Sequence, residues 1–157
     1  MIDGSVLLDK LVEMLRGIQD LVLEMNGDPE RIFAYHDQYP KRSSVAHAIH
    51  QMPVPSIMAV WHGDGPGLFG SIDVWKHHFK LYLRARETFD DDPPNPYNRL
   101  FRLIVKGVPQ GADVPMLNAT VHPSCYPMDF PSIERQPDAE GLDYFEVPIT
   151  FTEIGDD

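Results

Sequence analysis

This sequence has little cysteine, a deficit of basic charge and no long hydrophobic run, and each shortage excludes a class of protein. One cysteine among 157 residues, Cys125, cannot form an internal disulfide, which excludes a disulfide-stapled scaffold. No apolar stretch approaches the ~20 residues that a membrane-spanning helix needs. The 13 Lys and Arg residues against 24 Asp and Glu give a formal net charge of −11. Since binding to a phosphate backbone requires a basic surface, we expect neither a membrane nor a specific nucleic-acid partner.

The length and the first residues set two further expectations. A chain of 157 residues suits one domain, 1–157, that buries roughly 70% of its extended surface. The start, Met1-Ile2-Asp3-Gly4, lacks the basic region and apolar run of a signal peptide. We therefore expect synthesis in a reducing, cytoplasmic environment.

The clearest pattern lies in the last seventeen residues, from Gly141 to Asp157, where apolar side chains alternate strictly with others. The apolar set is Phe145, Val147, Ile149 and Phe151, and the other set is Tyr144, Glu146, Pro148, Thr150 and Thr152. Alternation with period two predicts a strand with one buried face. Because Pro148 lacks a backbone N–H, this strand is expected at a sheet edge or at a bulge.

Two segments have the period of an amphipathic helix. The first, residues 6–25, carries Leu7, Leu8, Leu11, Leu15, Ile18, Val22 and Met25 on one stripe. Asp3 or Ser5 can cap it, and Asn26-Gly27 can end it. The second starts with Asn95 as cap and Pro96 at the first helical position, and its apolar face carries Tyr97, Leu100, Phe101, Ile104 and Val108.

Further strands are predicted at residues 32–35, 56–62, 71–86 and 117–121, with a helical turn within 41–51 and an ordered proline-rich loop over 123–138. In residues 71–86 the apolar phase switches near 76–78, which predicts a bulge there. The order of elements indicates an α+β fold, in which two main helices pack on one face of a largely antiparallel or mixed sheet.

One motif matches the sequence of a nucleotide-binding pattern but not the structural context that the pattern needs. Residues 65–70 read Gly-Pro-Gly-Leu-Phe-Gly, the G-x-G-x-x-G of dinucleotide sites. The following residues read as a strand instead of the helix that would hold the pyrophosphate, and Pro66 removes one amide donor. A glycine-rich hairpin connection explains the motif better, so no cofactor is predicted.

The histidines and acidic residues do not form a recognisable catalytic or metal-binding pattern. His47 and His50 are three residues apart on the predicted helical turn, while His62, His77, His78, His122 and Cys125 are scattered. His77 and His78 are adjacent in a strand and point to opposite faces. The His122–Cys125 pair lacks an orienting carboxylate, and Asp90-Asp91-Asp92 lacks the spacing of a calcium loop. We predict no catalytic residue and no metal ligand.

The segment from Asp73 to Leu83, Asp-Val-Trp-Lys-His-His-Phe-Lys-Leu-Tyr-Leu, supports a family resemblance when it is read with the two helices and the closing strand. The chain resembles the tail terminator proteins of long-tailed bacteriophages, of the lambda type, in size, in element order and in its final alternating strand. The proline-rich residues 123–137 and the extended residues 28–55 depart from that pattern. A neighbouring neck or head-completion protein therefore stays open.

The resemblance implies a non-enzymatic virion protein at the head–tail interface, assembled in the host cytoplasm. Such a protein forms a homo-oligomeric ring, usually a hexamer, that caps the tail tube, stops its polymerisation and contacts the head-completion or connector protein. DNA would pass through an acidic lumen without specific binding. The expected interface residues lie in two proline-rich loops and on an aromatic strand position: Tyr39, Lys41, Arg42, His47, His50, Trp61, Asp90, Asp91, Asp92 and Pro94.

The alternative is a small cytoplasmic metal-dependent enzyme, or a ligand-binding α+β module, that uses His47, His50 and His62. Measurements of metal content and of mass in solution distinguish the ring-forming virion protein from the metal-dependent enzyme or ligand-binding module.

Overall fold

The computed structural model describes residues 3–35, 45–69, 71–85, 96–107, 134–137 and 143–153. The helices are α1 (Gly4–Arg16), α2 (Gln19–Glu24), the 3₁₀ turn η1 (Pro29–Arg31), α3 (Val45–Gln51) and α4 (Pro96–Gly107). The strands are β1 (Ile32–Ala34), β2 (Ser56–Phe69), β3 (Ile72–Arg84), β4 (Glu134–Pro137) and β5 (Asp143–Glu153). None of the described helices is both long and apolar enough to cross a membrane. The predicted strand at 117–121 lies outside the described residues.

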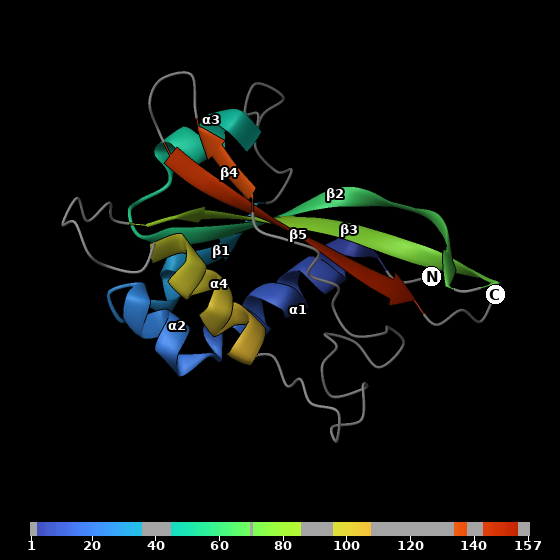
Figure 1. The fold of residues 1–157 in the computed structure, drawn as a ribbon, viewed down its shortest axis with the longest axis horizontal. Helices are drawn as coiled ribbons and strands as arrows, with labels where there is room; N and C mark the ends of the chain where they lie inside the picture. The colour runs from blue at the N-terminus through green and yellow to red at the C-terminus, as the bar shows by residue number, and fades with distance from the viewer. Residues whose placement is uncertain are drawn as a thin grey trace.

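The strands form one mixed sheet in the order β1-β2-β3-β5-β4 (Figure 1). Among the described strands, β1 and β2 alone pair in parallel, while β2–β3, β3–β5 and β4–β5 are antiparallel. The α+β class with a largely antiparallel or mixed sheet is therefore confirmed.

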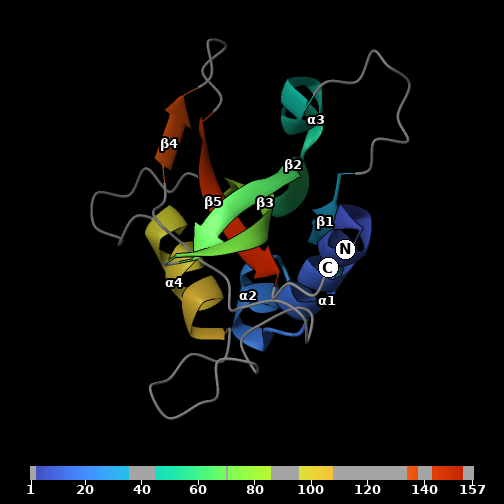
Figure 2. The same ribbon diagram turned by 90° about the vertical axis from the view of Figure 1, so that its right-hand side faces the viewer.

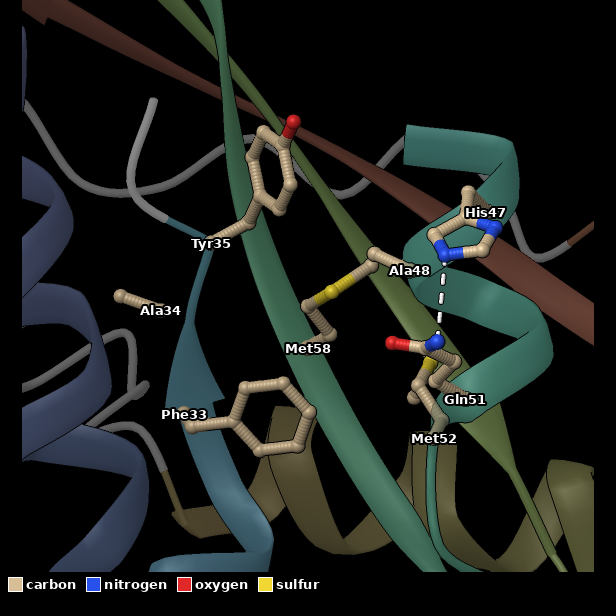
Figure 3. Close-up of a pocket in the computed structure, with 8 residues that line it drawn as sticks. All are labelled: Phe33, Ala34, Tyr35, His47, Ala48, Gln51, Met52 and Met58. Carbon is tan, nitrogen blue, oxygen red and sulfur yellow. Dashed lines mark hydrogen bonds between the residues drawn. The ribbon is translucent and has the colours of Figure 1, made fainter. Parts of the chain in front are cut away.

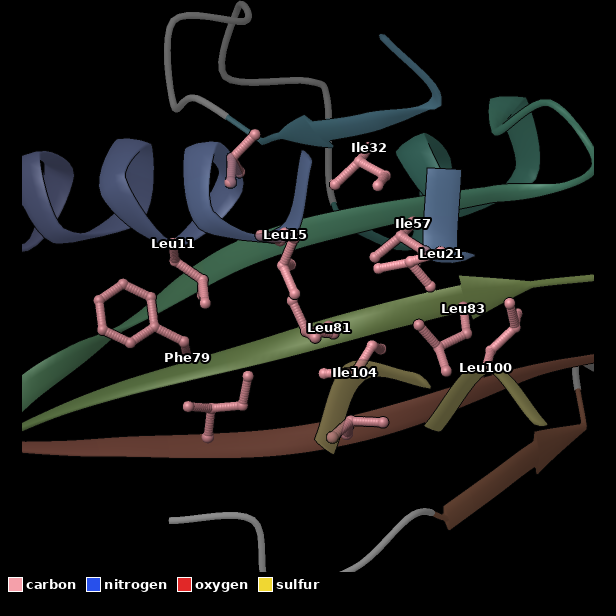
Figure 4. Close-up of a cluster of buried hydrophobic side chains, with 14 of the residues drawn as sticks. Leu11, Leu15, Leu21, Ile32, Ile57, Phe79, Leu81, Leu83, Leu100 and Ile104 are labelled. Carbon is pink, nitrogen blue, oxygen red and sulfur yellow. The ribbon is translucent and has the colours of Figure 1, made fainter. Parts of the chain in front are cut away.

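The helices divide between the two faces of the sheet (Figure 2). Residues of α1, α2 and α4 pack in one apolar cluster with alternate residues of the strands, and Figure 4 shows several of its members: Leu11, Leu15, Leu21, Ile57, Leu81, Leu83, Leu100 and Ile104. The two main helical segments thus lie on one face, as predicted. The short helix α3 packs on the opposite face, where Ile49 and Met52 contact Met58, Val60 and Tyr82.

The leading helix starts as predicted but is not continuous. Asp3 caps α1 by accepting a hydrogen bond from the Ser5 backbone N–H at 2.9 Å. The prediction of one helix over 6–25 is wrong, because α1 ends at Arg16 and α2 begins at Gln19. Ile18 between them is extended, with φ −84° and ψ 100°. This break lets the apolar stripe continue around a corner, so that both Leu15 and Leu21 are buried.

Strand β2 is longer than predicted and carries the bulge that was expected in its partner. It continues to Phe69 through the glycine-rich residues, so residues 65–69 of the hairpin connection predicted at 65–70 are strand. The register with β3 shifts between Trp61 and Gly63, where Gly63 has φ +106°. Glycine adopts this positive φ without the steric cost that a Cβ imposes. The bulge predicted at 76–78 of β3 is wrong, since β3 pairs with β5 in unbroken register from Trp75 to Leu83.

Strand β5 confirms the alternation. Phe145, Val147, Ile149 and Phe151 are buried, and the residues between them are half-buried. The predicted edge position is correct for only part of the strand. β4 pairs with residues 143–146, whereas from residue 147 onward, where Pro148 lies, β5 pairs with β3 on one side and with no described strand on the other. The predicted loop over 123–138 is wrong in its last part, because Glu134–Pro137 is β4.

Candidate interaction surface

The far end of β2 and β3 extends beyond the other labelled elements in Figure 1. Residues 67–69 of β2 and 72–74 of β3, here called the ribbon tip, pair only with each other among the described strands. Leu68 at the tip is 61% exposed. A large apolar side chain at the end of a two-stranded projection is accessible for contact with another molecule.

Gly67 gives the ribbon tip a close contact that a larger residue would block. A Cβ built on Gly67 would lie 2.8 Å from Cδ and Cε of Lys76, so the lysine stem lies directly over this glycine. Gly65 has nothing within 4 Å of such a Cβ. The glycines at 63, 65 and 67 thus alternate along one face of β2, and only Gly67 is covered by a neighbouring side chain.

The root of the ribbon is held by a buried polar cluster, here called the His77 clamp. His77 on β3 is 0% exposed, and its two ring nitrogens face carboxylates of both neighbouring strands. Nδ1 lies 2.6 Å from Oδ1 of Asp64 on β2, and Nε2 lies 2.9 Å from Oε2 of Glu153 on β5. An ionised carboxylate only accepts hydrogen bonds. Either both ring nitrogens carry protons, or one of the two carboxyl groups is itself protonated.

Trp61 extends the clamp to the start of α1. Its Nε1–H donates to Oδ1 of Asp64 at 2.9 Å, and its indole lies where a Cβ on Gly4 would be. Trp61 is 42% exposed, so its outer face stays accessible. This predicted interface residue therefore has a structural role, as a link between α1 and the ribbon, together with a free surface.

The opposite face of the sheet carries a second polar group around the bulge. Nε2 of His62 lies 3.1 Å from the Tyr82 hydroxyl, and Nζ of Lys80 donates to Oε2 of Glu146 at 3.3 Å. Partial burial lowers the pKa of His62, and the positive charge of Lys80 adds to this effect. Burial also raises the pKa of Tyr82, so its hydroxyl keeps its proton at neutral pH.

A cavity of about 230 Å³ lies between β1, β2 and α3 (Figure 3). Phe33, Tyr35, Met52 and Met58 provide most of its apolar wall. His47 lies at its rim with Gln51, whose Nε2 is 3.1 Å from Nε2 of the imidazole. His47 thus faces a hollow that can receive a side chain or a small apolar group.

The residues predicted for the interface are only partly within the described chain. Tyr39, Lys41, Arg42, Asp90, Asp91, Asp92 and Pro94 lie outside the described residues. His47 lies at the rim of the cavity, His50 is half-buried on α3, and Trp61 belongs to the His77 clamp. His62 lies on the bulge of β2, and in the described ranges no three His, Cys, Asp or Glu side chains gather in a way that could hold a metal ion.

The sequence reasoning missed the His77 clamp. Asp64 and His77 are thirteen residues apart, and His77 and Glu153 are separated by 76, so no local spacing brings them together. One signal was present: His77 shares the phase of Phe79 and Leu81, which places it on the buried face. A histidine in that phase requires partners for both nitrogens.

Comparisons with protein-family models and with curated proteins find no match to this sequence.

Proposed function

We propose that this protein is a structural, non-enzymatic component of the phage head–tail neck. In this proposal it forms a homo-oligomeric ring, a hexamer in the usual arrangement, that caps the tail tube and stops its polymerisation. The ring then joins the tube to the head-completion or connector protein in the virion. The family resemblance of the sequence and the α+β fold support this proposal, and the ribbon tip is the observation that carries it.

The ribbon tip favours assembly of the head-to-tail kind. Leu68 lies at the end of a projection that no other described element covers. A contact between such a tip and a different surface of the next copy is heterologous, and a heterologous contact forms a ring when its rotation closes. The stretch of β2 from Val60 to Phe69 has no described strand on its outer side, which offers further backbone groups to a neighbour.

The charge of the chain fits a lumen through which DNA slides. With a formal net charge of −11, several copies in a ring would surround DNA with like charge. Like charges disfavour adhesion, so the double helix would pass without specific contacts. Salt would screen this repulsion over about 10 Å at 0.1 M ionic strength.

The test compares two exposed leucines in a protein that assembles. Leu68→Asp places a charge on the ribbon tip, and Leu23→Asp places one on α2, where Leu23 is 70% exposed. Light scattering and negative-stain images, with and without tail tubes, should show rings for wild type and Leu23→Asp and monomers for Leu68→Asp. A wild-type protein that stays monomeric both alone and with tail tubes would contradict the proposal.

The ligand-binding alternative is favoured by one observation, the cavity that His47 borders. A ligand-binding module, or a metal-dependent enzyme that uses His47, His50 and His62, should retain a stoichiometric metal or small molecule through purification without a histidine tag. Elemental analysis and native mass spectrometry check this. Metal that is lost in His47→Ala or His50→Ala would favour the alternative over the ring.

A further inference from the structure

The cavity between β1, β2 and α3, here called the α3-side cavity, has room for a side chain from another molecule. Phe33, Met52 and Met58 line it with an aromatic ring and two thioethers, which adapt to the shape of an inserted group (Figure 3). Its volume of about 230 Å³ exceeds the ~150 Å³ of a cavity that holds benzene. A leucine side chain is smaller than a benzene ring, so the α3-side cavity can receive one.

The chain itself carries an apolar side chain that projects far from this cavity. Leu68 is the most exposed large apolar residue of the described strands, at 61%. Met58 in the cavity wall lies on the same strand, and the ten residues from Met58 to Leu68 span roughly 30 Å (Figure 1). Strand β2 is paired with β3 over this whole length, so the leucine of one copy cannot reach the cavity of the same copy. It can reach the cavity of a second copy.

We propose that Leu68 of one copy inserts into the α3-side cavity of the next copy, and that this insertion is the contact that builds the assembly. The inference rests on the proposed function, since it requires that copies of the chain associate through the ribbon tip. The tip and the cavity are different surfaces, so the contact is heterologous, and each copy gives one leucine and receives one. Such a contact repeats from copy to copy and forms a ring when its rotation closes.

The ribbon tip brings a negative charge together with its leucine. Asp73 of β3 lies directly opposite Leu68 in the register of β2 and β3, and side chains of such a pair are on the same face. Its side chain is exposed. Asp73 is also the one charged residue among residues 67–69 and 72–74 that form the tip. The tip therefore presents an apolar side chain with a carboxylate beside it.

The surroundings of the cavity carry the complementary charge. No Asp or Glu is among the described residues that line it. Arg84 lies beside Met52 of the wall, where its Nη1 donates to the Met52 carbonyl at 2.8 Å, and this neutral acceptor leaves the charge of the guanidinium in place. Lys80 and Glu146 on the same face pair with each other and add no net charge. Because copies with a net charge of −11 repel one another, this local attraction favours the cavity as the place where a tip binds.

The experiment mixes two full-length variants that are each expected to be monomeric. Leu68→Asp blocks the tip and keeps the cavity, whereas Ala48→Trp fills the cavity from α3 and keeps the tip. One intact tip and one intact cavity remain in a mixture of the two. Analytical ultracentrifugation of an equimolar mixture should therefore find heterodimers of twice the mass of one chain and nothing larger. Leu23→Trp, which adds the same ring on the exposed surface of α2, should assemble like wild type.

Asp73→Lys, added to the Ala48→Trp copy, tests the charge at the tip. It should weaken the heterodimer about threefold, the effect of a partly exposed ion pair, although it lowers the net negative charge of that copy. Asp20→Lys on α2 changes the net charge equally and should not weaken the heterodimer. Thermal melts monitored by circular dichroism verify that each variant folds. If Ala48→Trp melts early, Gln51→Trp blocks the same cavity from its exposed rim.

The outcomes distinguish this contact from the ring. Heterodimers in the mixture, together with open chains of the wild type, would support the contact and contradict the ring. Rings of Ala48→Trp, or rings of the wild type without heterodimers in the mixture, would overturn the contact and leave the ring in place. A small molecule that native mass spectrometry finds in wild type and not in Ala48→Trp would assign the cavity to a ligand, which also overturns the contact. Monomers throughout, also with tail tubes, would overturn both.

Discussion

The two ends of β3 bury the same face of the sheet in different ways. At one end Phe79, Leu81 and Leu83 pack against apolar side chains of the helices. At the other end the same face carries His77, which is equally buried but has carboxylates on both sides. Helix-covered apolar packing depends on volume and tolerates several shapes, whereas the clamp requires particular atoms at hydrogen-bond distance.

This difference has a consequence for the ribbon. Apolar burial at the helical end stabilises the sheet without specifying where the ribbon goes, since dispersion and the hydrophobic effect have little directionality. The His77 clamp joins β2, β3 and β5 two residues before the pairing of β3 with β5 ends at Trp75. It therefore fixes the direction in which the ribbon leaves the sheet.

The largest effect is expected from the apolar end. Phe151→Ala removes a ring that packs edge-to-face on Phe79, with centroids 5.6 Å apart. A buried Phe→Ala change costs about 3–5 kcal/mol, against a total stability of roughly 5–15 kcal/mol. Chemical denaturation should show this loss, whereas Thr150→Ala, on the opposite face, should change the free energy of unfolding by less than about 1 kcal/mol. Equal losses would mean that the two faces of β5 are assigned wrongly.

The second-largest effect is a difference in stability between substitutions of two histidines that are adjacent in the sequence. His77→Leu removes the two hydrogen bonds that the imidazole shares with the carboxyl groups of Asp64 and Glu153, which should cost about 3 kcal/mol at about 1.5 kcal/mol for each charge-assisted bond. His78→Leu changes an exposed side chain and should cost about 0.5 kcal/mol or less. Denaturation curves of both variants check the contrast. If the two variants melt alike, the clamp does not stabilise the fold.

A third effect concerns the contact between α1 and the ribbon root. Gly4→Ala places a methyl group where the Trp61 indole lies, so the ring must turn away and release Asp64. Overpacking of this kind costs about 1–3 kcal/mol, and the tryptophan emission should shift to longer wavelength as the indole becomes hydrated. Gly65→Ala is the matched control, because a Cβ there has nothing within 4 Å. A Gly4→Ala variant with wild-type emission and stability would contradict the contact.

Periodicity predicted the parts of the fold that depend on local patterns. The alternation of Phe145 to Phe151 predicted β5, and Pro96 correctly predicted the start of α4. The helical stripe over 6–25 did not reveal the break at Gly17 and Ile18, because apolar residues on both sides of the corner face the same core. The hydrophobic period of a helix identifies which residues are buried, but it does not show where the helix axis changes direction.

The bulge and the clamp could not be predicted because they depend on pairing between distant strands. The change of apolar phase in 71–86 predicts an inserted residue in β3, whereas β3 is in unbroken register with β5 and a polar residue, His77, occupies a buried position. The actual bulge lies opposite, at His62 in β2. A register shift can be placed on either of two paired strands, and one strand alone does not identify which.

The smallest effect is the pH dependence that His62 contributes at the bulge. Partial burial against the Tyr82 ring, together with the charge of Lys80, lowers the pKa of folded His62 below its ordinary value of 6.5. Between these two values the unfolded chain binds more protons than the folded protein, so stability falls as the pH decreases through 6.5 and levels off below the folded pKa. His62→Gln should reduce the loss of melting temperature between pH 7.5 and pH 5.5. Tyr82→Phe keeps the buried ring and removes only the hydroxyl, so it should retain most of that loss. If His62→Gln melts with the same pH dependence as wild type, the imidazole at the bulge is solvated in the folded state, and burial there does not set its protonation.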